Sequence, residues 1–277
     1  MIAATTKEED SVKDIFIANT HSYMLLFTNK GKIHWLKVYY VPEASRQARG
    51  KAIVNLIELE NDEKVTAYVP VKDFNHSHYL IMATKNGTIK KTELSAYSNP
   101  RKGGIIAISL EKEDNLIGVK LTEGSNEIIL ATRNGIAVRF NENKVRPTGR
   151  SAQGVRGIKL MQDDYVIGMV VANDNETLLT VTENGYGKRT KVDDYRLVNR
   201  GSIGVRNIIC SERNGKVVSI NSVNENDELM LITMKGMTIR TQVSQISVIG
   251  RNTQGVRLIT LEESDKLVGV AKIVIED

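Results

Sequence analysis

The chain has 277 residues, of which 41% are apolar, enough to bury a sizeable core in one large or two medium domains. Lys and Arg number 38 against 33 Asp and Glu, and the formal net charge of +5 mildly favours polyanionic partners. The single cysteine, Cys210, excludes an intramolecular disulfide, and no stretch approaches 18 consecutive apolar residues. We therefore expect a cytoplasmic protein that is neither secreted nor membrane-spanning.

A tetrapeptide of the form Thr-x-Asn/Lys-Gly recurs five times along the chain. Each copy follows an apolar run and precedes a mixed run of apolar and polar residues. Two such runs around a glycine turn predict a β-hairpin, because Gly and Asn tolerate the positive φ that these turns need. The copies end at Gly31, Gly87, Gly135, Gly185 and Gly236, in steps of 56, 48, 50 and 51 residues.

A second series of glycines keeps step with the first, at Gly50, Gly104, Gly154, Gly204 and Gly255. Each is followed by a predicted apolar strand, such as AIVNLIEL after Lys51, then by an acidic turn and another strand. One unit of about fifty residues and four strands has the size of a propeller blade. We predict repeats at roughly 12–66, 67–121, 122–171, 172–223 and 224–277.

The segment from Val12 to Ala18 matches the last strand of a unit whose earlier part is missing, so we expect the chain to begin inside a repeat. A single four-stranded unit cannot bury its faces alone, and neighbouring units should pack side by side and close into a ring that hides their edges. A solenoid is the structural alternative, but its coils are usually shorter. The predicted fold is a single all-β, propeller-like domain over residues 1–277.

Basic residues recur in the second strand of the hairpins. The position four after the turn glycine is Lys91, Arg139, Arg189 and Arg240 in repeats two to five, and Trp35 in the first. Two further cations, Lys90 and Lys188, precede two of these. Solvated strand positions are often basic for no functional reason, but four in register predict one continuous basic perimeter.

The loops around the second glycine are also basic, whereas acidic residues gather in the turns between the last two strands of a repeat. Such segregation is typical of a surface that holds nucleic-acid phosphates without reading sequence. Aromatic residues, which stack on the bases of single strands, make up only 5% of the chain, so duplex is favoured. The predicted loop contacts are Arg49, Lys51, Arg101, Lys102, Arg150, Arg156, Arg200, Arg206, Arg251 and Arg257.

Patterns that carry chemistry are weak in this chain. The spacing of Gly149 and Gly154 resembles a phosphate-binding loop, but Val and Arg follow where such a loop needs Lys and Ser or Thr. The pair His76 and His78 lacks an evident third metal ligand, and paired acids such as Asp193 and Asp194 lack a partnering His. We predict no catalytic residue, metal site or cofactor in this chain.

Four longer segments resemble the C-terminal domain of DNA gyrase A, part of a type IIA topoisomerase, and the match runs from about Lys7 to the end. They are FTNKGKIHWLKVY, ATKNGTIKKTEL, ENGYGKRTKVDDY and QISVIGRNTQGVRLI. The resemblance implies a β-pinwheel, in which neighbouring blades exchange a strand and a basic rim wraps duplex DNA. This wrap lets the holoenzyme introduce negative supercoils.

The resemblance also implies binding partners and a cellular location. Double-stranded DNA, the rest of DNA gyrase A and its partner DNA gyrase B are the expected partners, in the bacterial cytoplasm near the nucleoid. The catalytic tyrosine, ATP and Mg belong elsewhere in the holoenzyme. The family's wrapping heptapeptide, of the form QRRGGKG, has only a partial match here, QARGKAI from Gln47 to Ile53. Two alternatives stay open: a topoisomerase IV-like domain that binds DNA without wrapping, and a protein-binding propeller scaffold.

Overall fold

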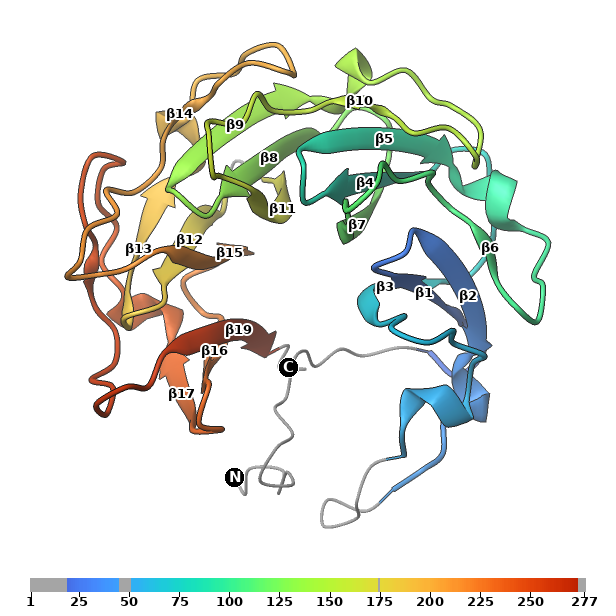
Figure 1. Ribbon diagram of the computed structural model, residues 1–277, viewed down its shortest axis with the longest axis horizontal. Coiled ribbons are helices and arrows are strands. Elements are labelled where there is room, and N and C mark those ends of the chain that lie inside the picture. The colour runs from blue at the N-terminus through green and yellow to red at the C-terminus, as the bar shows by residue number, and fades with distance from the viewer. Residues whose placement is uncertain (1–18, 45–50, 174, 274–277) are drawn as a thin grey trace. The chain divides into compact units, whose positions relative to one another are not determined.

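A computed structural model describes residues 19–44, 51–173 and 175–273, so Arg49 and the strand expected at Val12–Ala18 lie outside the described residues (Figure 1). The described residues form 19 strands and six short 3-10 helices, which confirms the all-β prediction. Among them, no helix has the length and apolar character needed to cross a membrane. They divide into two compact units, with 19–126 and 142–157 in unit 1 and 127–141 and 158–273 in unit 2, apart from the gaps above.

Unit 1 contains two four-stranded sheets, with strand orders β3-β1-β2-β6 and β10-β5-β4-β7. Its 3-10 helices are η1 Val38–Tyr40, η2 Ile53–Asn55, η3 Leu94–Tyr97 and η4 Glu142–Lys144. Its strands are β1 Tyr23–Thr28, β2 Lys32–Lys37, β3 Val65–Val71, β4 Tyr79–Thr84, β5 Thr88–Glu93, β6 Ile105–Ile106, β7 Leu116–Thr122 and β10 Val155–Arg156.

Unit 2 contains three sheets, with orders β11-β8-β9-β14, β15-β12-β13-β18 and β17-β16-β19. Its 3-10 helices are η5 Val192–Asp194 and η6 Val243–Gln245. Its strands are β8 Glu127–Thr132, β9 Ile136–Asn141, β11 Val166–Ala172, β12 Thr177–Thr182, β13 Tyr186–Lys191, β14 Val205–Arg206, β15 Val217–Val223, β16 Glu228–Thr233, β17 Thr238–Gln242, β18 Val256–Arg257 and β19 Leu267–Ile273.

Each four-stranded sheet takes its fourth strand from the following repeat. The two-residue strands β6, β10, β14 and β18 pair antiparallel with β2, β5, β9 and β13 of the repeat before (Figure 1). The strand exchange that the resemblance implies is therefore present within each unit. The closed ring stays a prediction, as does the single domain; the first predicted repeat boundary, at residue 66, falls inside β3.

The segments after the second glycine are shorter strands than the sequence predicts. After Ile106 the chain turns, and the N–H groups of Ala107 and Ile108 both donate to the carbonyl of Gly31, at 2.8 and 3.1 Å. These N–H groups are thus taken by a hairpin turn instead of a strand partner. The strand predicted over Ala52–Leu59 is wrong, because the N–H groups there bond within the turn of η2.

The hydrophobic core of each unit lies between its sheets. Leu25 and Phe27 of β1 share one buried cluster with Leu80 and Met82 of β4 in unit 1. In unit 2, strands β12 and β16 contribute to a shared cluster in the same way. Neighbouring repeats therefore bury their apolar faces against one another, as expected of sheets that are not stable alone.

We expect Gly204→Ala to lower the free energy of unfolding by about 1–3 kcal/mol, because Gly204 has φ +84° and a Cβ there would lie 2.3 Å from the Ala137 carbonyl oxygen. This contact is where the loop of the fourth repeat crosses β9. The control is Gly250→Ala, whose Cβ would meet no atom within 4 Å. Urea unfolding of both variants makes the comparison, and equal midpoints would contradict a requirement for glycine at the crossing.

Candidate nucleic-acid interface

Five of the six cations predicted from the hairpins are buried and do not line a solvent-facing perimeter. Their exposed fractions are 0% for Lys90 and Lys188, 4% for Lys91, 5% for Arg189 and 9% for Arg139. The reason is that the strands carrying them face the following repeat. The sixth, Arg240, is exposed and forms an ion pair with Glu228.

Lys90 and Lys188 hold the basic loops of the next repeat from inside. The Nζ atom of Lys90 donates to the carbonyls of Ala107 at 2.6 Å and Arg150 at 2.5 Å. Nζ of Lys188 donates to the carbonyls of Gly250 at 2.7 Å and Arg251 at 2.8 Å. Burial, with a nearby arginine in each case, lowers the pKa of Lys90 to about 7 and that of Lys188 to about 8.

The residue four positions after the turn glycine performs one task in successive repeats. It donates to a carbonyl in or just after the 3-10 helix of the next repeat: Arg139 to Val192 at 3.0 Å and Arg189 to Ile246 at 2.7 Å. Lys91 lies 3.3 Å from the buried Glu142 carboxylate of η4. In the first repeat, the indole N–H of Trp35 donates to Tyr97 at 2.9 Å. The basic residues that recur at this position are therefore long side chains that donate hydrogen bonds to the next repeat.

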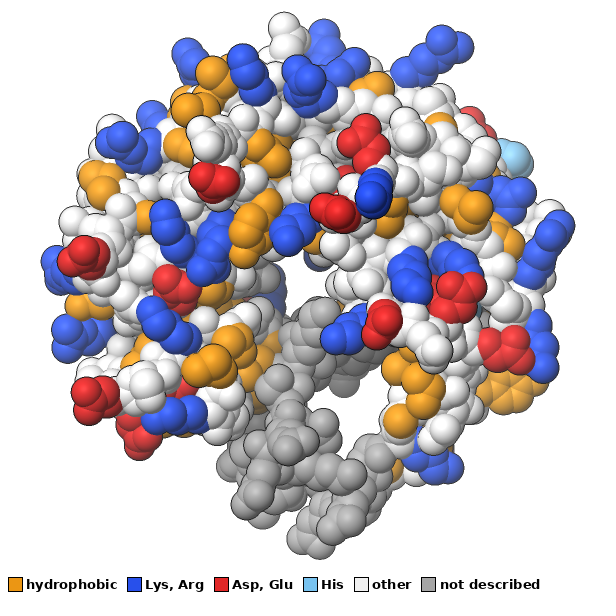
Figure 2. All heavy atoms as spheres, in the orientation of Figure 1, with side chains coloured by type: hydrophobic (Ala, Val, Ile, Leu, Met, Phe, Trp, Pro, Cys, Tyr) orange, Lys and Arg blue, Asp and Glu red, His pale blue; other side chains and the backbone are white. Residues whose placement is uncertain are grey.

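The loop cations, by contrast, lie at the surface. Figure 2 shows Lys and Arg side chains projecting beside β10, in the second sheet of unit 1. One loop cation is in contact with an acid: Lys102 Nζ lies 2.9 Å from Glu58 Oε1. The exposed members are Lys51, Arg101, Lys102, Arg150 and Arg156 in unit 1 and Arg206 and Arg257 in unit 2, where Arg200 and Arg251 are half-buried.

Within each unit, the basic loops of successive repeats are hydrogen-bonded to one another. In unit 1, Ser109 donates through its hydroxyl to the Ser151 carbonyl at 2.7 Å. In unit 2, the Ile209 N–H donates to Thr253 at 2.9 Å, and Arg251 Nη1 donates to the carbonyl of Arg206 at 3.0 Å. The structure therefore brings the loop cations of neighbouring repeats together, whereas it withdraws the hairpin cations.

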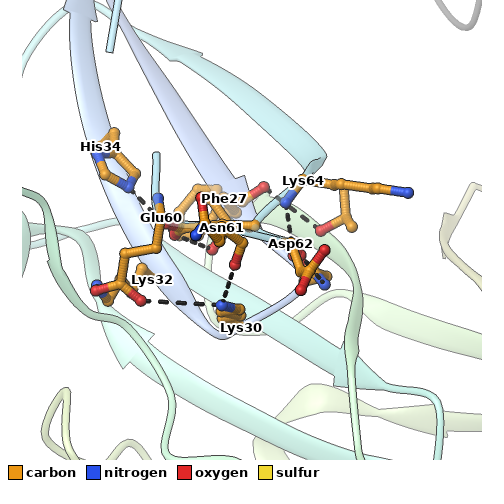
Figure 3. Close-up of polar contacts among 12 residues, drawn as sticks. Phe27, Lys30, Lys32, His34, Glu60, Asn61, Asp62 and Lys64 are labelled. Atoms are coloured by element: carbon orange, nitrogen blue, oxygen red, sulfur yellow. Dashed lines mark hydrogen bonds and ion pairs between the residues drawn. The ribbon is translucent and has the colours of Figure 1, made fainter. Parts of the chain in front are cut away.

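The acidic turns form hydrogen bonds and ion pairs with the hairpin turns, as Figure 3 shows for the first repeat. Lys30 Nζ donates to the Asn61 carbonyl at 2.6 Å, and Lys32 Nζ pairs with Glu60 at 2.5 Å (Figure 3). Burial would raise the pKa of Glu63, but hydrogen bonds from the Glu60 N–H, the Thr28 hydroxyl and His34 hold it below its ordinary value. These carboxylates are engaged in turn structure, which also neutralises Lys30 and Lys32.

Arg213 escapes the sequence prediction because it stands in a turn that is acidic in other repeats. It is exposed, and its guanidinium lies 5.0 Å from the centroid of the Tyr186 ring. The available signal is its alignment with Asp62, Glu113 and Asp163, each one residue before a second acid of its turn.

Repeats of about fifty residues, each completing the sheet of its predecessor, define a strand-exchanging β-repeat domain of the propeller type. The profile of a family described as the DNA gyrase C-terminal domain, a β-propeller, matches residues 22–72, 78–123, 126–173, 176–224 and 227–273. The chain belongs to this family.

Known relatives and structures agree with this assignment. The DNA gyrase A protein of Salmonella typhimurium is 49% identical over 271 residues, which is 98% of this chain and 31% of that protein. The chain thus spans about a third of the relatives it matches. A crystal structure of the C-terminal domain of DNA topoisomerase IV is 29% identical, with a TM-score of 0.87 over 98% of this chain and 85% of that one. A DNA gyrase A C-terminal domain structure is 28% identical, with a TM-score of 0.80 over 95% and 90%.

We expect the buried lysines to make stability rise with pH. A lysine whose pKa is lower in the folded state binds fewer protons there than in the unfolded chain, so the free energy of unfolding increases between the two pKa values. The window runs from about 7 for Lys90, or about 8 for Lys188, up to the ordinary value of 10.5, with a slope of up to ~1.4 kcal/mol per pH unit for each residue.

Urea unfolding of the wild type, Lys90→Met and Lys188→Met across this range measures the effect. Each methionine should also destabilise by about 1–3 kcal/mol, because two carbonyls of the packed loops lose the lysine donor. The gap between wild type and variant should widen as pH rises. Parallel stability curves would show that these amines titrate normally.

Proposed function

We propose that this chain binds duplex DNA along its exposed basic loops and bends it, as part of a DNA gyrase A protein, so that the holoenzyme can introduce negative supercoils. The observation that carries the proposal is the continuity of the basic loops within each unit, where neighbouring loops hydrogen-bond and present their cations to solvent. Membership of the gyrase C-terminal domain family supports the same conclusion.

The proposed contacts are electrostatic and independent of sequence. Arginine and lysine side chains on loops neutralise backbone phosphates, and the released counterions make affinity fall steeply with salt. Bending 20–30 base pairs by 40–90° costs about 1–6 kcal/mol, which several phosphate contacts can offset. Strand cleavage, ATP and Mg then belong to the rest of DNA gyrase A and to DNA gyrase B, outside this chain.

A second candidate function is binding without wrapping, as proposed in the topoisomerase IV-like alternative. The similarity to the topoisomerase IV C-terminal domain, with a TM-score of 0.87, favours this candidate. Both candidates use the same loop cations, and they differ in whether the bound duplex follows a chiral path.

We expect Arg150→Ala with Arg156→Ala to weaken duplex binding roughly tenfold, equivalent to about 1.4 kcal/mol. The dependence of log affinity on log salt should become shallower by about 0.9 for each phosphate that is no longer neutralised. Fluorescence anisotropy with a labelled duplex, at several salt concentrations, provides both quantities. Lys112→Ala with Lys120→Ala removes the same charge from exposed positions in the acidic turn and on β7. Equal losses in the two double variants would contradict a role for the loops.

Wrapping is tested by binding the chain to nicked circular duplex, sealing the nick with ligase and reading the linking number after protein removal. We expect a positive shift that grows with protein and fades with salt. Retarded DNA without a shift would support the non-wrapping candidate. Absence of binding would overturn the DNA proposal in favour of a protein-binding scaffold.

A further inference from the structure

Two arginines flank one tyrosine on the surface of unit 2. The guanidinium carbon atoms of Arg213 and Arg257 lie 5.0 and 5.5 Å from the centroid of the Tyr186 ring. Arg257 donates to the Tyr186 hydroxyl through Nη2 at 2.9 Å and Nε at 3.3 Å. Both arginines are exposed, whereas Tyr186 is buried, so the tyrosine ring lies beneath two solvent-exposed guanidinium groups.

This cluster borders a hollow of about 380 Å³ on the surface, which Asn184, Thr260 and Asp265 also line. Asp265 is the acid among these lining residues, and it is 5% exposed. Its Oδ1 atom accepts the N–H groups of Lys235 and Lys266, at 3.1 and 2.8 Å. The hollow thus presents two exposed guanidinium groups against one buried carboxylate, whose Oδ1 atom is engaged by two backbone N–H groups.

Neither arginine is used to balance a carboxylate. Within the described part of the chain, the guanidinium groups of Arg213 and Arg257 interact with Tyr186, and these interactions include no ion pair. A guanidinium carries five N–H donors, and the tyrosine hydroxyl occupies few of them. Most of their donor capacity therefore faces the hollow and solvent.

The site occurs once among the described repeats, because two substitutions and one insertion coincide there. Tyr186 follows the turn glycine where other repeats have Lys32, Thr88, Ile136 and Met237. Arg213 stands where the other turns have Asp62, Glu113, Asp163 and Ser264, and this turn is one residue longer. The additional Gly215 has φ +73°, and a Cβ there would lie 2.4 Å from Glu183 Cγ.

We propose that Arg213 and Arg257 bind a phosphate group over the Tyr186 ring. The identity of the natural ligand as a backbone phosphate of duplex DNA rests on the proposed function of the chain. Paired guanidinium groups match the geometry of phosphate oxygens and form charge-assisted hydrogen bonds with them. The Tyr186 hydroxyl orients Arg257, so the cation is held in place before the phosphate arrives.

The tyrosine reports on occupancy. Hydrogen bonds from Arg213 and Arg257 lower the pKa of Tyr186 below its ordinary value of 10.0. A phosphate that takes donors from both guanidinium groups and adds negative charge raises it again. The ionisation of Tyr186 is thus a readout independent of DNA retention.

The experiment uses the full chain as wild type, Arg213→Ala and Tyr186→Phe. The control is Lys191→Ala, which removes one exposed charge from the same strand, β13. Duplex affinity and its salt dependence are measured by anisotropy. Tyrosinate absorbance is followed through a pH titration with and without inorganic phosphate, and the Tyr186→Phe spectrum is subtracted to isolate Tyr186.

We expect Arg213→Ala to weaken duplex binding roughly fivefold and to reduce the salt slope by about 0.9, with little change in Lys191→Ala. Inorganic phosphate should raise the pKa of Tyr186 in the wild type and should not change it in Arg213→Ala. If duplex affinity does not change but phosphate still shifts the titration, the site binds a small phosphate instead of DNA.

Failure of the two proposals can be told apart. A wild type that binds duplex, with Arg213→Ala behaving like Lys191→Ala and no phosphate effect on Tyr186, would overturn this site and leave the DNA proposal standing. A wild type without duplex affinity whose Tyr186 responds to phosphate would keep the site and end the DNA proposal. Loss of both responses would overturn both.

Discussion

The short donated strand is the contact on which the rest of this structure depends. Two residues from one repeat complete the sheet of the repeat before it, as Val256 and Arg257 do for β13. Two residues of pairing are too few to hold alone, and the chain on either side of them carries N–H and carbonyl groups that need partners once buried. The turn glycine and the next two interior positions of the hairpin meet this need. The carbonyl of Gly185 accepts the N–H groups of Leu258 and Ile259, Lys188 binds the loop, and Arg189 binds the turn after η6.

This requirement explains why cations recur in the hairpins. A buried charge is costly unless it is paired or hydrogen-bonded, and these side chains donate to carbonyls of the chain packed against them. The exception in the first repeat supports the interpretation, because Trp35 is uncharged and its N–H makes the equivalent bond to Tyr97. What the position needs is reach and a donor, and Lys, Arg and Trp all supply both. Charges that recur once per repeat can therefore arise from the contacts that join repeats, without any role in ligand binding.

The hairpins were predictable because their turn chemistry is local: a glycine after Asn or Lys specifies the turn from neighbouring residues alone. The exchange of β6, β10, β14 and β18 was not predictable from spacing, since a strand looks the same whichever sheet it joins; the resemblance supplied it. Burial of Lys90 was missed for a related reason. Its neighbours Lys91 and Thr92 are polar, as in an exposed strand, and only the packing of the next repeat removes Lys90 from water. Apart from Arg49 in the undescribed segment and the half-buried Arg200 and Arg251, the predicted loop cations are exposed, because loops with glycine and arginine seldom find a buried environment.

The same architecture determines which substitutions can test for direct contacts with DNA. Loops such as the one carrying Arg150 are presented at the surface by an interior lysine, so a change at Lys90 would move the loop without touching a phosphate. Loss of affinity in such a variant would measure positioning, and loss in a variant of Arg139 would measure the joining of repeats. Two measurements together distinguish a phosphate contact from a positioning role. Removing a phosphate contact changes the slope of affinity against salt, whereas displacing a loop also lowers the free energy of unfolding. Unfolding and salt titration must therefore be measured on the same variants before any cation of this chain is assigned to the DNA.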